Sequence, residues 1–91
     1  MKVLLVEDSR TMRNIQRGIL AQMGFEDVEE ATNGLDALSR LADIEPDLIL
    51  VDWNMPEMDG ITFVKRVRAS GNAVSIVMVT TESQKKRVVE A

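Results

Sequence analysis

Strand-like runs alternate with amphipathic segments along the 91-residue chain. The runs predicted to form strands are residues 2–6, 28–31, 48–51 and 74–79, of which 28–31 is the weakest and is expected at a sheet edge. Between them, apolar residues recur every three or four positions, as on one face of a helix. Strands that alternate with helices through short connections form a parallel sheet. The pattern therefore predicts one α/β domain, because 91 residues leave no room for a second core.

Composition excludes several kinds of site. The chain has no Cys and no His, so it cannot form disulfides, thiolate or imidazole metal sites, or Ser–His and Cys–His nucleophile pairs. Its net charge of −4 and its 3% aromatic content disfavour direct nucleic-acid binding. No stretch approaches the ~20 apolar residues of a membrane span, and the first apolar run is too short to direct export. We therefore expect a cytoplasmic protein that binds neither nucleic acid nor membrane.

Acidic side chains follow two of the predicted strands at their carboxyl ends. Glu7 and Asp8 come directly after the first strand, and Asp52 ends the third. Ligands of open parallel sheets bind beyond these ends, so the three carboxylates converge if the two strands are neighbours. Their mutual repulsion would be relieved by raised pKa values or by a bound cation. Oxygen ligands without sulfur or imidazole suit Mg²⁺.

Such a pocket is suited to phosphoryl chemistry, although each residue also has a simpler interpretation. Asp52 could accept a phosphoryl group, and Thr80, after the fourth strand, could donate a hydrogen bond to it. Alternatively, Asp8 or Ser9 could cap a helix, Asp52 could form an Asx-turn, and Thr80 could end a strand. Spacing alone leaves both interpretations open.

Three stretches at these strand ends resemble the receiver domains of response regulators. They are VEDS at 6–9, VDWNMPEMDG at 51–60 and VMVTTE at 77–82. The similarity extends over essentially the whole chain, including residues 11–13 and 28–31. It implies a flavodoxin-like, doubly wound parallel sheet with strand order 2-1-3-4.

The resemblance also implies a Mg²⁺-dependent signalling switch rather than a turnover enzyme. Asp52 matches the phosphoacceptor, Thr80 the switch hydroxyl, and the backbone N–H of Thr81 would contact the phosphoryl group. The implied Mg²⁺ ligands are Glu7 (through water), Asp8, Asp52 and the backbone carbonyl of Asn54. The phosphoryl donor would be a phosphohistidine on a sensor histidine kinase, or acetyl phosphate. Slow autodephosphorylation would be a side activity.

The receiver pattern normally continues beyond the length of this chain. We therefore expect residues 1–91 to form a single receiver domain that is incomplete at its C-terminus, without the family's fifth strand and fifth helix. Residues 82–91 have helical composition. The fourth strand would then be a free edge that invites pairing. This predicts a homo-oligomer formed through the fourth strand or by exchange of the terminal helix.

Two alternatives to the phosphoacceptor hypothesis follow from the same residues. One is a truncated or engineered receiver scaffold that folds by self-association and has lost phosphotransfer. The other is a small aspartyl-phosphate phosphatase with Asp52 as nucleophile. The phosphatase is disfavoured, because those enzymes place an Asp-x-Asp pair on the first strand, and Asp52-x-Asn54 does not match it.

Overall fold

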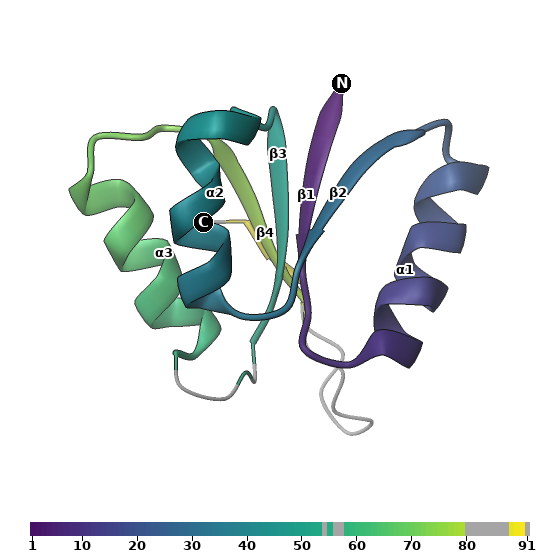
Figure 1. The fold of residues 1–91 in the computed structure, drawn as a ribbon, viewed down its shortest axis with the longest axis horizontal. Coiled ribbons are helices and arrows are strands. Elements are labelled where there is room, and N and C mark those ends of the chain that lie inside the picture. The colour runs from purple at the N-terminus through teal and green to yellow at the C-terminus, as the bar shows by residue number, and fades with distance from the viewer. Residues whose placement is uncertain (54, 56–57, 80–87, 91) are drawn as a thin grey trace.

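A five-stranded sheet forms the centre of the molecule (Figure 1). The computed structural model describes residues 1–53, 55, 58–79 and 88–90. In chain order the elements are β1 (Lys2–Val6), α1 (Arg10–Gln22), β2 (Asp27–Ala31), α2 (Gly34–Ile44), β3 (Leu48–Asp52), α3 (Gly60–Ala69), β4 (Ser75–Val79) and β5 (Val88–Glu90). The strand order is β2-β1-β3-β4-β5, and β1 to β4 pair in parallel. The predicted α/β class and the order 2-1-3-4 are confirmed.

The sheet continues past β4, where we expect no further strand from the sequence. β5 pairs with β4 in antiparallel orientation, with Val79 opposite Val88 and Val77 opposite Glu90. The prediction of a free fourth-strand edge is therefore wrong over 77–79, and the prediction of helix is wrong over 88–90. Two consecutive β-branched valines favour an extended backbone, and the unpaired groups of an edge strand favour its pairing. The rest of the 82–91 segment lies outside the described residues.

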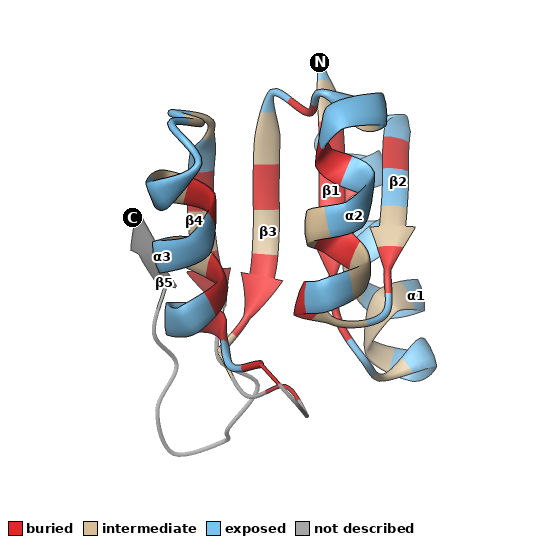
Figure 2. Ribbon diagram, turned by 60° about the vertical axis from the view of Figure 1, so that its left-hand side comes forward, coloured by how far each residue is buried: buried red, intermediate tan, exposed pale blue. Residues whose placement is uncertain are grey.

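Helices cover the two faces of the sheet unequally. α2 and α3 lie on one face and α1 lies on the other (Figure 1). Because side chains alternate along a strand, β1, β3 and β4 each send apolar residues to both faces. The core between the sheet, α2 and α3 contains Leu4, Val6, Ile49, Val51, Phe63, Val67, Ile76 and Met78, and the smaller core under α1 contains Val3, Leu5, Leu20 and Val28. Figure 2 shows buried residues along these strands and on the inner sides of α2 and α3.

Local signals in the sequence set the helix boundaries. Ser9 caps α1, and Asn33 caps α2 by accepting a hydrogen bond from the Asp36 N–H at 2.7 Å. Gly24 follows α1 with a φ of 93°, a left-handed conformation that glycine adopts without strain. None of the helices in the described part of the chain is long and apolar enough to cross a membrane.

Candidate metal site at the carboxyl edge of the sheet

Strand register brings the predicted acidic residues together at one edge of the sheet. β1 and β3 are neighbours, with Val6 opposite Val51, so Glu7 and Asp52 follow at adjacent positions. One carboxylate oxygen from each of Glu7, Asp8 and Asp52 lies within 4.8 Å of the other two. The three carboxylates are therefore close enough to share a single cation.

The environment of Glu7 is one that a bound cation would suit. Its side chain is 1% exposed, and Asp52 beside it is 5% exposed, whereas Asp8 reaches solvent. Oε2 of Glu7 accepts a hydrogen bond from the Ser9 N–H at 2.8 Å. Oε1 is buried and has no hydrogen-bond partner among the described residues. An unpaired buried carboxylate oxygen costs free energy that a bound cation would recover.

The electrostatics of Glu7 also favour a bound cation at this cluster. Burial, the largest cause, and the adjacent Asp8 and Asp52 together raise the pKa of Glu7 from its ordinary value of 4.5 to about 7, against the Ser9 N–H, which lowers it. A hard cation would reverse this balance, because it favours the ionised form of every carboxylate around it. The donor set is oxygen only, which fits Mg²⁺.

β4 reaches the same edge of the sheet as the acidic residues. Val79, its last residue, is in register with Asp52, and the Trp53 N–H donates to the Val79 carbonyl at 2.9 Å. Trp53 is half-buried. The other residues assigned to the site from the sequence, Asn54, Thr80 and Thr81, lie outside the described residues, and their roles stay predictions.

Gly60 is a residue whose importance the sequence analysis misses. Its N–H donates to the Trp53 carbonyl at 3.0 Å, which folds the start of α3 back onto the end of β3. A Cβ at position 60 would lie 2.8 Å from the Asp52 carbonyl oxygen and 3.1 Å from the Trp53 Cα. Glycine is therefore required for this close approach. The available signal was the Asp59-Gly60 pair, which indicates only a turn.

Comparison with known proteins agrees with this fold. The model of the response regulator receiver domain matches residues 3–91. The chain is 45% identical to chemotaxis protein CheY1 of Helicobacter pylori, covering 100% of this chain and 76% of that protein. It is 39% identical to CheY-3 of Vibrio cholerae, covering 100% of this chain and 72% of that protein.

Solved structures of response regulators share this fold. The chemotaxis response regulator CheY4 of Vibrio cholerae superposes with a TM-score of 0.79 at 40% identity, over 90% of this chain and 69% of that one. The MaeR response regulator bound to beryllium trifluoride superposes with a TM-score of 0.80 at 26% identity, over 91% of this chain and 70% of that one. This chain therefore belongs to the response regulator receiver domain family.

Membership confirms the family inferred from the sequence and sets the general role of the chain. Receiver domains are switches of two-component signalling and are generally not enzymes. They take phosphoryl groups from histidine kinases and bind Mg²⁺ at an acidic pocket.

Proposed function

We propose that this chain is a Mg²⁺-dependent switch that accepts a phosphoryl group on Asp52. The observation that carries the proposal is the convergence of Glu7, Asp8 and Asp52, with the Oε1 atom of Glu7 buried and unpaired within the described part of the chain. Three carboxylates gathered at the carboxyl edge of a parallel sheet are placed for ligand binding. A cluster of this kind is costly unless a cation or a proton offsets its charge.

Mg²⁺ would be held by Glu7, Asp8 and Asp52, with the Asn54 carbonyl as the ligand implied by family resemblance. Bound there, it would supply positive charge to offset that of the phosphoryl oxygens. A carboxylate oxygen of Asp52 attacks phosphorus and forms an O–P bond. The bond from phosphorus to the donor breaks, and its electron pair leaves with the imidazole or the acetate. Because Asp52 is 5% exposed, water has restricted access to the acyl phosphate, which makes autodephosphorylation slow.

The remaining steps of the switch involve residues beyond the described part of the chain. We assign to the Thr80 hydroxyl and the Thr81 N–H the hydrogen bonds to the phosphoryl oxygens. The donor is a sensor histidine kinase or acetyl phosphate, and the chain acts in the cytoplasm. The chain transmits a signal in this scheme and does not turn over a substrate.

Trp53 offers a direct test, because it is the single tryptophan and follows Asp52 in the chain. Its fluorescence is recorded while MgCl₂ is added, and again after beryllofluoride is added. Intact mass is measured after incubation with acetyl phosphate and Mg²⁺. We expect saturable Mg²⁺ binding, a second fluorescence change, and the mass increase of one phosphoryl group.

Two variants make this test specific. Asp52→Asn removes the proposed acceptor and should abolish phosphorylation, whereas Asp43→Asn makes the same charge change at an exposed position on α2 and should behave as wild type. If the wild type does not respond to Mg²⁺, the proposed site is wrong. If it binds Mg²⁺ but never gains a phosphoryl group, the alternative of a receiver scaffold without phosphotransfer is correct.

A further inference from the structure

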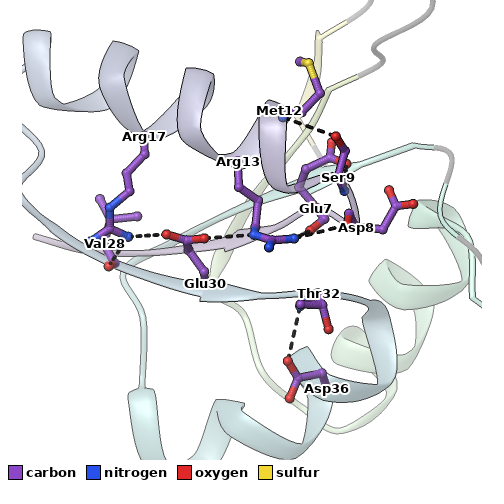
Figure 3. Close-up of polar contacts among 10 residues, drawn as sticks. All are labelled: Glu7, Asp8, Ser9, Met12, Arg13, Arg17, Val28, Glu30, Thr32 and Asp36. Atoms are coloured by element: carbon purple, nitrogen blue, oxygen red, sulfur yellow. Dashed lines mark hydrogen bonds and ion pairs between the residues drawn. The ribbon is translucent and has the colours of Figure 1, made fainter.

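Arg13 connects α1 to the backbone of the acidic turn. Its Nη1 donates to the carbonyl oxygen of Glu7 at 2.8 Å and to that of Asp8 at 3.2 Å. Its Nε donates to Oε1 of Glu30 at 2.9 Å. The side chain is only 13% exposed, and Figure 3 shows the guanidinium lying between β2 and the turn. Arg13 thus contacts the carbonyl groups of the two residues whose carboxylates face Asp52.

Glu30 fixes the orientation of the Arg13 guanidinium. It lies on β2, in register with Leu5 of β1. Its second oxygen, Oε2, accepts from Arg17 Nη1 at 2.7 Å, so both carboxylate oxygens are engaged (Figure 3). A planar guanidinium held through Nε has little freedom left at Nη1. Its contacts with the turn are therefore set by β2 as well as by α1.

The turn is held from two sides. From β2, the Ala31 carbonyl accepts the Glu7 N–H at 3.1 Å. From α1, Arg13 binds the Glu7 and Asp8 carbonyls. Together these bonds restrain the peptide planes on both sides of the Glu7 and Asp8 Cα atoms. The backbone sets the direction of each Cα–Cβ bond, so this restraint also limits where the two carboxylates can lie.

We propose that Arg13 is a positioning residue for the metal site: it holds the Glu7–Asp8 backbone so that both carboxylates face Asp52 before Mg²⁺ binds. The proposal rests on the proposed function. Arg13 contacts carbonyl oxygens of the turn, so it orients ligands and is not itself a ligand. Outer groups that orient metal ligands commonly contribute 10–100-fold to metal affinity.

The sign of the effect separates positioning from simple charge. A guanidinium near a cation site repels the cation, so removal of its charge alone would tighten Mg²⁺ binding. Loss of a positioning contact weakens it. We expect Arg13→Gln to raise the Kd for Mg²⁺, read from Trp53 fluorescence, by about 10-fold. Arg13→Lys should weaken binding similarly, because one ammonium cannot reproduce the planar fork that spans Glu30 and two carbonyls.

Arg17→Gln is the matched control. It removes the same charge from the same cluster, but Arg17 contacts Glu30 and the Val28 carbonyl and not the turn. We expect its Kd for Mg²⁺ to stay within about threefold of wild type, as for a partly exposed ion pair. Equal weakening in Arg17→Gln and Arg13→Gln would overturn the proposal, and so would unchanged or tighter binding in Arg13→Gln.

A second readout works on metal-free protein and does not depend on the proposed function. Amide hydrogen exchange at residues 7–9 should be faster in Arg13→Gln than in wild type and unchanged in Arg17→Gln, while exchange in β3 stays the same. If wild type fails to bind Mg²⁺ and this pattern still appears, the metal function is wrong and the positioning contact stands. Unchanged exchange at residues 7–9 would overturn the contact itself. Should Arg13→Gln not fold, Glu30→Ala, which releases the guanidinium but keeps Arg13, must show the same two changes to a smaller degree.

Discussion

The two faces of the sheet come from the same strands but differ in packing. On the face under α2 and α3, Ile49 and Ile76 are completely buried. Their chain neighbours Leu50 and Val77 point to the other face, where α1 is the only helix in the described part of the chain, and they are half-buried. Apolar alternation along a strand therefore sets which face a residue points to, while local coverage by a helix sets how well it is buried, since Val3 and Leu5 of β1, on the α1 face, are buried too.

The exposed apolar surface of the α1 face is concentrated in one place. Ile19 and Met23 of α1 are 52% and 65% exposed. With Phe25 and residues of β3 and β4 they line a groove of about 470 Å³. α1 is thus less firmly packed than α2 and α3. Polar contacts such as those of Arg13 therefore contribute more to holding α1 in place, because packing alone holds this helix less tightly.

The candidate metal site takes its residues from segments that lead to helices on both faces of the sheet. Asp52 precedes the loop to α3 on the well-packed face, whereas Glu7 and Asp8 lie in the turn to α1. Its geometry therefore depends on both helix layers at once.

The largest expected effect tests the packing difference with adjacent residues of β3. Ile49→Ala and Leu50→Ala each remove three carbon atoms, from opposite faces of one strand. We expect Ile49→Ala to lower the free energy of unfolding by about 2–5 kcal/mol. Leu50→Ala should cost about half as much, because part of that side chain is already in water. Urea unfolding measures both, and equal losses would show that the two faces are packed alike.

The next largest effect concerns the carboxyl edge of the sheet, where the acidic residues lie. Among the described residues the buried charged side chains are Glu7 and Asp52, both at this edge. Burial raises the pKa of Glu7 from 4.5 to about 7 in the folded protein. Between these values the folded state holds a proton that the unfolded state has lost, so stability falls as pH rises through this window and is flat above it.

The change across the window is about 3 kcal/mol for metal-free protein. Urea unfolding in EDTA between about pH 4.5 and pH 8 measures it. Glu7→Gln should flatten the profile and be more stable than wild type at pH 8. Leu50→Ala should keep the wild-type slope. A slope that survives in Glu7→Gln would assign the titration to another group.

A third comparison uses one glycine from α3 and one from α1, which lie on opposite faces of the sheet. Gly60→Ala places a Cβ against the Asp52 carbonyl at 2.8 Å, so backbone must move. We expect a loss of about 1–3 kcal/mol in the free energy of unfolding. Gly18→Ala lies within α1 with no atom within 4 Å of the added Cβ, and it should gain about 0.5–1 kcal/mol. Thermal and urea unfolding report both, and a stable Gly60→Ala protein would show that the loop has room to adjust.

The sequence was sufficient for features that depend on local pattern. Alternating apolar runs placed β1 to β4, and Ser9 was one of two candidate caps for a helix. Convergence of Glu7, Asp8 and Asp52 followed once β1 and β3 were taken as neighbours, because parallel strands end at the same edge.

Features that depend on tertiary contacts were not predictable in the same way. Charged residues around Val88 and Val89 suggested a helix, but pairing with β4 makes these valines a strand. The contacts of Arg13 with the turn depend on how α1 lies against β1, which no local pattern records. The close approach of Gly60 to Asp52 depends on the path of the loop between β3 and α3.

The smallest expected effect compares the N-caps of the helices on the two faces. Ser9 Oγ accepts the Met12 N–H at 3.3 Å in α1, and Asp59 Oδ1 accepts the Thr62 N–H at 2.8 Å in α3. Alanine at either position should cost about 1 kcal/mol at neutral pH. The shorter bond and the charge of Asp59 make its loss the larger of the two.

Low pH should distinguish the two caps further, because Asp59 titrates and Ser9 does not. The Thr62 N–H holds the pKa of Asp59 below its ordinary value of 3.8, so its contribution is complete above that value and is lost as pH falls through the folded-state pKa. Asp59→Asn keeps an acceptor oxygen without the titration. Between about pH 5 and pH 3 it should therefore lose less stability than wild type, whereas Ser9→Ala should follow the wild-type profile in urea unfolding. If Asp59→Asn and wild type lose stability in parallel, the cap of α3 does not depend on the charge of Asp59, and the two helices are capped by equivalent neutral hydrogen bonds.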